Sequence, residues 1–226
     1  MASFHSSRPV HTKKPLVGGP NGGLVFQPAP GKHSATIIFI HGLGDSAEGL
    51  EDIVEMWGSD FPQVKFILPS AGTMPISVYG GMSASAWYDI ASMDEKGREK
   101  DPTTGIEESK AFIQSLVEQE IQSGVLLSRI ILMGFSQGGA MTLFTGLQLA
   151  LSDELLERGS RSGKYPKRCA GLLVLAGYLP NKNKFTLSPL AVDTPICHLH
   201  GTADPLVLFS FAEKTRETLL EQVMPS

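Results

Sequence analysis

A serine set among glycines is the first feature of this sequence that could do chemistry. The stretch GFSQGG, residues 134–139, contains the pattern G-x-S-x-G around Ser136. The apolar run RIILM comes directly before it and a helical pattern directly after it. A nucleophile elbow needs this order of strand, sharp turn and helix, with small residues at Gly134 and Gly138 where the turn packs closely. We therefore predict that Ser136 is the nucleophile of an acyl-transfer reaction.

Two further loops could complete such a site. The oxyanion of acyl transfer needs one N–H donor from the residue after the nucleophile and one from a loop after an early strand. Gln137 occupies the first position, and Leu43 in HGLGD, residues 41–45, is the best candidate for the second. The stretch HGTADPLV places Asp204 after another predicted strand, where an acid could orient a histidine. Asp-Pro turns are also common without function, so both interpretations of Asp204 stay open.

Short, continuous apolar runs separate these motifs and predict the strands that position them. Such runs suit a parallel sheet that is buried on both faces. They are ATIIFI, VKFIL, RIILMG, AGLLVLA and PICHLH, which begin at residues 35, 64, 129, 170 and 195. Because helical patterns alternate with them, we predict a doubly wound, mostly parallel α/β sheet with its active-site loops at the carboxyl ends of the strands.

Three helices are predicted between these strands, over about 104–124, 137–147 and 206–222. A capping box in which Thr104 and Glu107 satisfy each other's backbone donors is expected to start the first of them. The domain is expected to cover residues 17–226, after a flexible tail, rich in Ser, Gly and Pro, over residues 1–16.

The composition excludes several classes of function. The 226 residues carry 19 Lys and Arg against 23 Asp and Glu, which offers no electrostatic basis for binding nucleic acid or an anionic membrane. No run approaches the ~18 apolar residues of a membrane helix, and no secretory signal opens the chain. No cofactor or metal motif is present. The two cysteines, Cys169 and Cys197, are expected to be buried and inert, which favours a cytoplasmic protein.

Together these stretches resemble the acyl-protein thioesterase/lysophospholipase family of carboxylesterases, which are α/β-hydrolases. Two more stretches carry the resemblance. LPSAGTMPISVYGGMSASAWYDI, residues 68–90, is similar to the family's long loop, with Pro75 and the tripeptide that begins at Trp87. LAGYLP, residues 175–180, is similar to the family's next strand and loop. The resemblance runs from about residue 17 to the C-terminus in consistent order and spacing.

Membership of this family would imply a serine hydrolase that cleaves long-chain acyl thioesters or esters. The implied substrates are S-palmitoylated proteins and lysophospholipids, in the cytoplasm and also the nucleus, with at most transient membrane contact. Ser136 would form the acyl-enzyme, Asp204 would be the triad acid, and Leu43 and Gln137 would hold the oxyanion. The implied contacts to the acyl group come from Trp87, Leu43 and Pro75.

The sequence also departs from the family's pattern in the substrate-side loop. Gly72 stands where a proline is usual, Ala84 and Ser85 replace the usual Met-Pro, and residues 157–168 look like an insertion. These departures leave the acyl preference open. The choice between protein thioesters and lysophospholipids, the acyl length and the oligomeric state are not predicted either.

The largest departure is the missing catalytic histidine, which the family carries after one further strand. Only 22 residues follow Asp204 (226 − 204), and none is a histidine. None of the six histidines is expected to substitute: His5, His11, His33, His41, His198 and His200. We therefore expect an α/β-hydrolase fold that lacks its last strand and helix, a truncated copy of a working enzyme. Its strand of residues 195–200 would be an open, apolar edge.

A chain without this base should be nearly inactive. A serine triad is worth ~10⁶ in rate, whereas the oxyanion hole and binding alone leave ~10³–10⁴ over water. Two alternatives stay open. A catalytically silent binder of acyl lipids or lipoproteins would keep the groove without the base. An enzyme like dienelactone hydrolase would share the fold class, but it would have a cysteine in place of Ser136.

Overall fold

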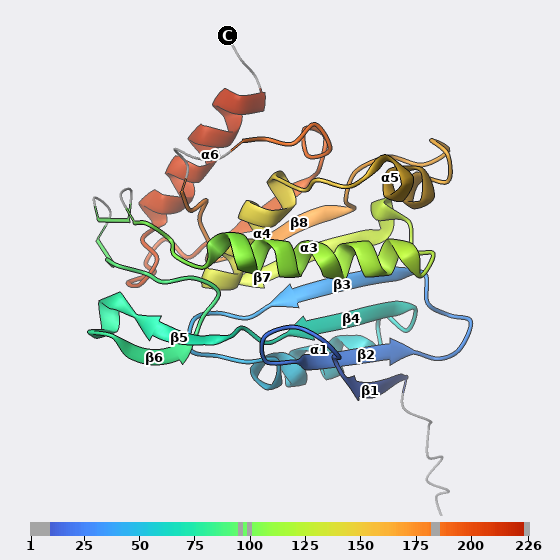
Figure 1. The fold of residues 1–226 in the computed structure, drawn as a ribbon, viewed down its shortest axis with the longest axis horizontal. Coiled ribbons are helices and arrows are strands. Elements are labelled where there is room, and N and C mark those ends of the chain that lie inside the picture. Colours follow the sequence, from blue (N-terminus) through green and yellow to red (C-terminus); the bar gives the residue numbers. More distant parts are fainter. Residues whose placement is uncertain (1–9, 95–96, 99–100, 182–185, 224–226) are drawn as a thin grey trace, which may run out of the picture.

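The fold is built on one seven-stranded sheet (Figure 1). The computed structural model describes residues 10–94, 97–98, 101–181 and 186–223. The strand order is β1-β2-β4-β3-β7-β8-β9; β2 runs antiparallel to β1 and β4, and the other neighbours are parallel. The predicted mostly parallel α/β sheet is confirmed. The strands are β1 (His11–Pro15), β2 (Gly23–Pro28), β3 (Ala35–Ile40), β4 (Val64–Pro69), β7 (Ile130–Phe135), β8 (Gly171–Leu175) and β9 (Ile196–Leu199).

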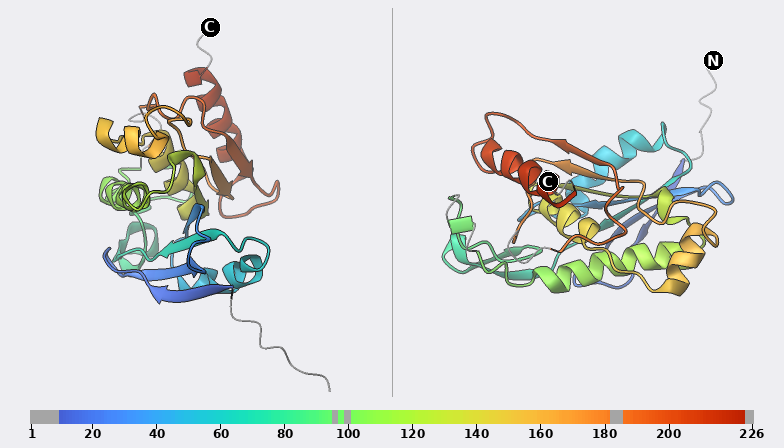
Figure 2. Two further views of the ribbon diagram at one scale, coloured as in Figure 1. Left: turned by 90° about the vertical axis from the view of Figure 1, so that its right-hand side faces the viewer. Right: turned by 90° about the horizontal axis from the view of Figure 1, so that it is seen from above.

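Helices cover both faces of the sheet, with α1 on one face and α3 on the other (Figure 2). A two-stranded hairpin, β5 (Thr73–Ile76) and β6 (Met82–Ser85), extends from the loop after β4. The helices are η1 (Glu48–Leu50), α1 (Glu51–Gly58), η2 (Ser77–Tyr79), α3 (Ile106–Gln122), η3 (Leu127–Arg129), α4 (Gln137–Leu147), α5 (Asp153–Ser160) and α6 (Phe209–Val223). Within the described residues, no helix combines the length and apolar character needed to cross a membrane.

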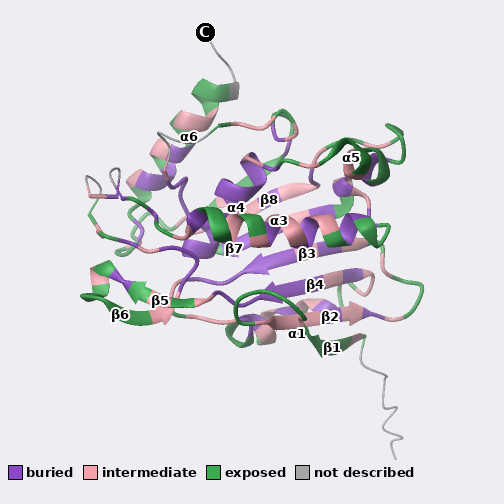
Figure 3. Cartoon of the chain, in the orientation of Figure 1, coloured by how far each residue is buried: buried purple, intermediate pink, exposed green. Residues whose placement is uncertain are grey.

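The central strands are buried on both sides, which explains their continuous apolar sequences (Figure 3). In β3, Ile38 and Ile40 face the layer of α3 and α4, while Phe39 faces α1 and stacks on Trp57. The register places Ile40 opposite Gly134. Because β3 and β7 are parallel, the loops that follow them leave the same edge of the sheet side by side. This register brings HGLGD and Ser136 together.

The first predicted helix begins differently from the expectation. The capping box of Thr104 and Glu107 does not form, and that prediction is wrong. Gly105 adopts a left-handed backbone with φ of 92°, so α3 begins at Ile106 and Glu107 lies too early in the first turn to reach back. The Glu107 carboxylate instead accepts from Lys110 at 2.6 Å. The end of the helix near Gly124 is close to the prediction.

The N-terminal strand β1 falls within the predicted tail. It pairs with β2 from His11 to Pro15 through its backbone, and four of its five residues are exposed. An edge strand of exposed polar residues has no apolar pattern, so sequence periodicity could not reveal it. Residues 1–9 lie outside the described part of the chain. The extent of the domain over residues 17–226 stays a prediction.

The strand β9 lies at the other edge of the sheet and has unusually exposed side chains. Leu199 is 57% exposed and Ile196 is 37% exposed, and among the described strands only β8 pairs with β9. The expectation for the two cysteines is therefore only half right. Burial raises the pKa of Cys169 to about 12, whereas Cys197 on β9 is exposed. An apolar strand whose outer edge has no partner among the described strands is a template for pairing with another chain.

We predict that replacing Leu199 with lysine reduces self-association of this protein. Pairing at β9 would then require desolvation of the new lysine ammonium group. The free energy of unfolding should change by no more than ~0.5 kcal/mol, because the position is exposed. Sedimentation velocity over a range of concentrations measures the association. Val17→Lys, at a side chain that is 86% exposed and distant in sequence from β9, is the matched control. Equal association of both variants would contradict the prediction.

Candidate active site

Ser136 stands on a strained turn between β7 and α4. Its φ of 54° and ψ of −118° lie where residues other than glycine are rarely found. The Ser136 N–H donates to the Leu175 carbonyl at 2.8 Å, and the Ser136 carbonyl accepts from the Ala140 N–H at 3.0 Å. Strain of this kind costs ~1–3 kcal/mol and persists only where surrounding contacts enforce it. The strand, turn and helix predicted from G-x-S-x-G are therefore present.

Two glycines allow this turn to pack against the sheet. A Cβ on Gly138 would lie 2.0 Å from the Ile40 carbonyl oxygen, and a Cβ on Gly134 would lie 2.1 Å from the Gly138 carbonyl oxygen. Both obstacles are backbone atoms, so no side-chain rotation could relieve them. The N-terminus of α4 therefore approaches the ends of β3 and β7 closely, and its partial positive charge lies at Ser136.

Ser136 lines a cavity of about 100 Å³ together with Leu43 and Gln137. The loop that carries Leu43 passes close by, since a Cβ on Gly42 would lie 3.4 Å from the Ser136 Cβ. The backbone N–H groups of Leu43 and Gln137 have no hydrogen-bond partner among the described residues. Unpaired donors beside a nucleophile are what an oxyanion requires. The structure thus brings these three predicted residues together, and their catalytic roles stay predictions.

His41 has a structural place in residues 41–45, the candidate oxyanion loop. Its ring is fully buried, with Nε2 accepting from the Ala71 N–H at 3.0 Å and Nδ1 2.7 Å from the Gly42 carbonyl oxygen. Because Nε2 accepts, the proton resides on Nδ1, which donates to Gly42. Burial lowers the pKa of His41 below its ordinary value and outweighs the hydrogen bond to Gly42. The neutral ring therefore holds two loops together.

The side chain of Gln137 connects the elbow to the long loop between β4 and α3. Its Oε1 accepts from the Trp87 N–H at 2.9 Å, and its Nε2 donates to the Tyr88 carbonyl at 2.8 Å. The Trp87 indole N–H in turn donates to the His41 carbonyl at 2.9 Å. All of these groups are buried, so each hydrogen bond is costly to leave unmade. This network fixes three loops relative to Ser136.

Trp87 and Pro75, two of the implied acyl contacts, do not reach the cavity of Ser136. Trp87 is 1% exposed and lines a separate cavity of about 330 Å³ with Met74 and Phe112. Pro75 is exposed on the β5–β6 hairpin, opposite Ser83. Their contact with an acyl group stays a prediction. Of the three implied contacts, only Leu43 lines the Ser136 cavity.

The Asp204 turn reaches the cavity through the residues that follow it. Asp204 Oδ1 accepts from the N–H groups of Leu206 and Val207 at 2.9 and 3.0 Å, and both of these residues line the Ser136 cavity. Partial burial raises the pKa of Asp204, but these two hydrogen bonds and nearby His200 outweigh it, so the pKa lies below its usual value. The turn delays α6, which begins at Phe209 rather than near residue 206.

None of the five histidines in the described part of the chain lines the Ser136 cavity. Each has a ring nitrogen at 2.6–3.0 Å from an oxygen elsewhere. The pairs are His11–Val64, His33–Thr36, His41–Gly42, His198–Gly177 and His200–Val207. His5 lies outside the described residues. Among described side chains, no group of three or more His, Cys, Asp and Glu is placed to hold a metal ion.

Several cavity residues were not predicted from the sequence. They come from loops without a chemical motif, and they are Tyr79, Ile90, Met93, Arg98 and Tyr178. Tyr79, Ile90 and Tyr178 had a signal, because they lie in residues 68–90 and 175–180, the two stretches that carried the family resemblance. The Tyr178 hydroxyl lies 3.0 Å from that of Tyr88, whose pKa burial raises well above the ordinary value. Arg98 had none, because it belongs to a charged stretch that resembles a solvated loop.

We predict that Gly138→Ala destabilises the protein while Gly201→Ala does not. The added methyl group would meet the Ile40 carbonyl in the first case, whereas Gly201 has open space around its Cβ position. Overpacking of this kind costs ~1–3 kcal/mol. Urea unfolding of both variants measures the difference. Equal midpoints would show that the elbow does not need glycine at this position.

We predict that stability falls as the pH drops below the unfolded-state histidine pKa of 6.5. Burial lowers the folded-state pKa values of His33, His41 and His198. The unfolded chain therefore binds protons that the folded chain does not, and stability is complete only above the unfolded value. Urea unfolding from about pH 8 to about pH 5 measures this slope, which His198→Asn should reduce. A flat profile would contradict it.

Comparisons with known proteins point to one family. The family model described as Phospholipase/Carboxylesterase matches residues 21–156 and 160–224. Acyl-protein thioesterase 1 of Neurospora crassa is 39% identical over 203 residues, which cover 86% of this chain and 76% of that protein. Acyl-protein thioesterase 1 of Schizosaccharomyces pombe is 38% identical over 177 residues, covering 77% and 70%.

Solved structures give the same result. Arabidopsis thaliana SOBER1 superimposes with a TM-score of 0.68 at 28% identity, over 84% of each chain. Zea mays acyl-protein thioesterase 2 superimposes with a TM-score of 0.64 at 27% identity, over 88% of this chain and 83% of that one. The family match covers most of the described residues and includes the elbow, the oxyanion loop and the Asp204 turn. This chain therefore belongs to the phospholipase/carboxylesterase family of α/β-hydrolases.

Proposed function

We propose that this protein is a serine hydrolase that acts on long-chain acyl thioesters or esters through an acyl-enzyme on Ser136. One observation carries the proposal. The strained Ser136 shares its cavity with Leu43 and Gln137, whose backbone N–H groups have no partner among the described residues. Family membership supports the hydrolase class, and the named relatives are acyl-protein thioesterases.

The reaction would proceed in two halves. The Ser136 Oγ attacks the carbonyl carbon, and the N–H groups of Leu43 and Gln137 stabilise the oxyanion that forms. The bond to sulfur or oxygen then breaks, the thiol or alcohol leaves with a proton, and the acyl group stays on Ser136. Water hydrolyses this ester through a second oxyanion. Asp204 would orient an imidazole base and stabilise its charged form.

The substrates that we propose are S-acylated proteins and lysophospholipids, in the cytoplasm and nucleus. Support comes from the names of the relatives and from the apolar side chains that line the cavity beside the nucleophile. These are Leu43, Ile90, Met93, Leu206 and Val207. Apolar walls suit an acyl group, and a few polar groups at the reacting end give orientation.

The general base is the weak point of this mechanism in the chain as it stands. No described histidine lines the Ser136 cavity. Turnover by this chain should therefore be limited to the rate enhancement of ~10³–10⁴ over water that the oxyanion donors and substrate binding supply. The further factor of ~10⁶ that a complete triad adds would be missing. The same observation favours the second candidate, a silent binder of acyl lipids or lipoproteins.

We predict that added imidazole restores part of the missing activity. Imidazole is a small diffusible base that can enter the cavity beside Ser136. There it can accept the Ser136 proton in place of a histidine side chain. Hydrolysis of an S-acyl thioester is followed by thiol release at increasing imidazole concentration, and the acyl adduct is located by mass spectrometry. We expect low basal turnover and a rise with imidazole that saturates.

Ser136→Ala is the matched control, since it removes the nucleophile and leaves the cavity walls in place. It should show no imidazole-dependent release above the rate without protein. Equal activity of Ser136→Ala would exclude the proposed nucleophile. Full activity without imidazole would mean that another group supplies the base. Binding of the acyl ligand without any rescue would favour the silent binder.

A further inference from the structure

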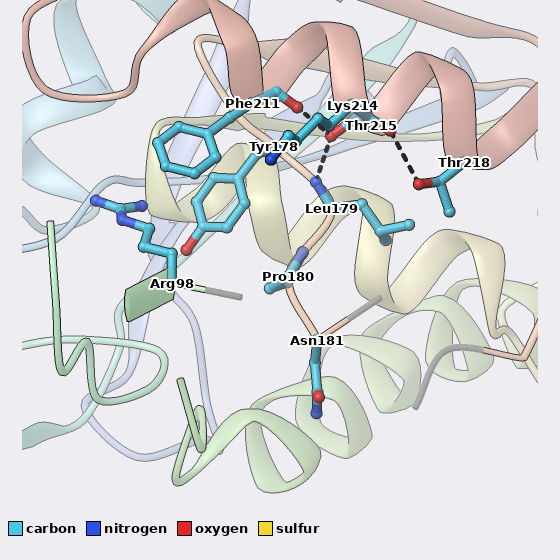
Figure 4. Close-up of a pocket in the computed structure, with 9 residues that line it drawn as sticks. All are labelled: Arg98, Tyr178, Leu179, Pro180, Asn181, Phe211, Lys214, Thr215 and Thr218. Atoms are coloured by element: carbon cyan, nitrogen blue, oxygen red, sulfur yellow. Dashed lines mark hydrogen bonds between the residues drawn. The ribbon is translucent and has the colours of Figure 1, made fainter. Parts of the chain in front are cut away.

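Arg98 is a buried cation on the wall of the proposed active site. Its residue is 7% exposed, and it lines the Ser136 cavity together with Tyr178. It also borders a smaller cavity of about 40 Å³ between Tyr178 and α6. Figure 4 shows its guanidinium beside the rings of Tyr178 and Phe211, and the distances to the ring centroids are 4.9 and 5.4 Å. The mechanism described above does not use this charge.

No carboxylate balances this charge among the described residues. Arg98 Nε donates to the Ser92 carbonyl at 3.2 Å, and Nη2 lies 3.2 Å from the weakly accepting Met93 sulfur. The carboxylate of Asp101, the next described acid after Arg98 in the sequence, accepts from the N–H groups of Ala91 and Thr103 instead. A guanidinium has five donors, and these two contacts are the ones that the described residues offer to it.

A buried guanidinium cannot avoid this imbalance by losing its proton. Arginine stays charged at any pH a protein tolerates, and a buried charge without a partner is strongly unfavourable. Cation–π attraction to the faces of Tyr178 and Phe211 offsets part of the free energy that burial of this charge costs. An anionic oxygen group of a ligand would offset more of this free energy, because a guanidinium binds phosphate through two charge-assisted hydrogen bonds.

We propose that Arg98 binds a phosphate group of the acyl substrate and so directs the site toward single-chain phospholipids. This inference rests on the proposed function. Arg98 and Ser136 line the same cavity, which has a volume of about 100 Å³. The anion must therefore lie only a few atoms from the reacting carbonyl. A lysophospholipid has its phosphate that close to its ester, whereas an acidic side chain of an S-acylated protein has no such fixed position.

The test compares two lipids that differ only in the phosphate. Lysophosphatidate and the monoacylglycerol with the same medium-length acyl chain are titrated, both below their micelle concentrations, by calorimetry. The wild type should bind lysophosphatidate ~10–100-fold more tightly, the fold-change that a charge-assisted hydrogen bond corresponds to. Because binding is measured, the result does not depend on turnover.

Variants assign that difference to Arg98. Arg98→Met keeps an unbranched side chain beside Tyr178 and Phe211 and should remove the preference for lysophosphatidate over monoacylglycerol. Arg98→Lys keeps the charge but not the planar fork, so it should retain part of the preference. Arg129→Met changes net charge equally at an exposed site and should change nothing. Thermal unfolding checks that each variant is folded.

The outcomes separate the inference from the proposed function. Equal affinities for the two lipids, or a preference that survives in Arg98→Met, would overturn the role of Arg98 and leave the acyl site intact. Binding of neither lipid would instead overturn the acyl site itself. Inorganic phosphate that competes as strongly as lysophosphatidate would show a site for free anions. An S-acylated acidic peptide that binds more tightly than lysophosphatidate, and only when Arg98 is present, would show a protein substrate. Either result would overturn the inference that Arg98 binds a lipid head group.

Discussion

The arrangement of the site depends on how closely the start of α4 approaches the ends of β3 and β7. Gly138 has no space for a Cβ because the Ile40 carbonyl would lie 2.0 Å away. This contact places a helix N-terminus directly under the turn and forces Ser136 into its strained conformation, with φ of 54°. The strained conformation persists because each side of the turn is held in place. The parallel register with β3 fixes β7 before the turn, and the close approach of Gly138 to Ile40 fixes the start of α4 after it.

Buried hydrogen bonds extend this constraint to the loops. Gln137 contributes its backbone N–H to the cavity and its side-chain amide to the loop at Trp87, while Trp87 binds the carbonyl of His41. One residue thus links a proposed oxyanion donor to the loop that carries the other. A change in any of these partners would leave a buried polar group unpaired, so these hydrogen bonds stabilise one arrangement of the loops.

Charge in the cavity is distributed unevenly. One carboxylate oxygen of Asp204 accepts hydrogen bonds from the backbone of Leu206 and Val207, which line the cavity. Arg98 lines the same cavity and has no acidic partner among the described residues. The described histidines serve backbone oxygens or Thr36. Within the described part of the chain, the wall of the Ser136 cavity thus carries a cation, Arg98, and no histidine.

Features set by a few neighbouring residues were accessible from the sequence alone. Glycine spacing predicted the elbow at Ser136, and continuous apolar runs predicted the parallel sheet, because both are local requirements of the backbone. Only the tertiary structure showed that Trp87 is a buried support for the candidate oxyanion loop and that Arg98 lines the same cavity as Ser136. Strand β1 and the start of α3 at Ile106, after the left-handed Gly105, were also missed. Such features depend on contacts between residues distant in sequence, and no local pattern encodes which groups meet there.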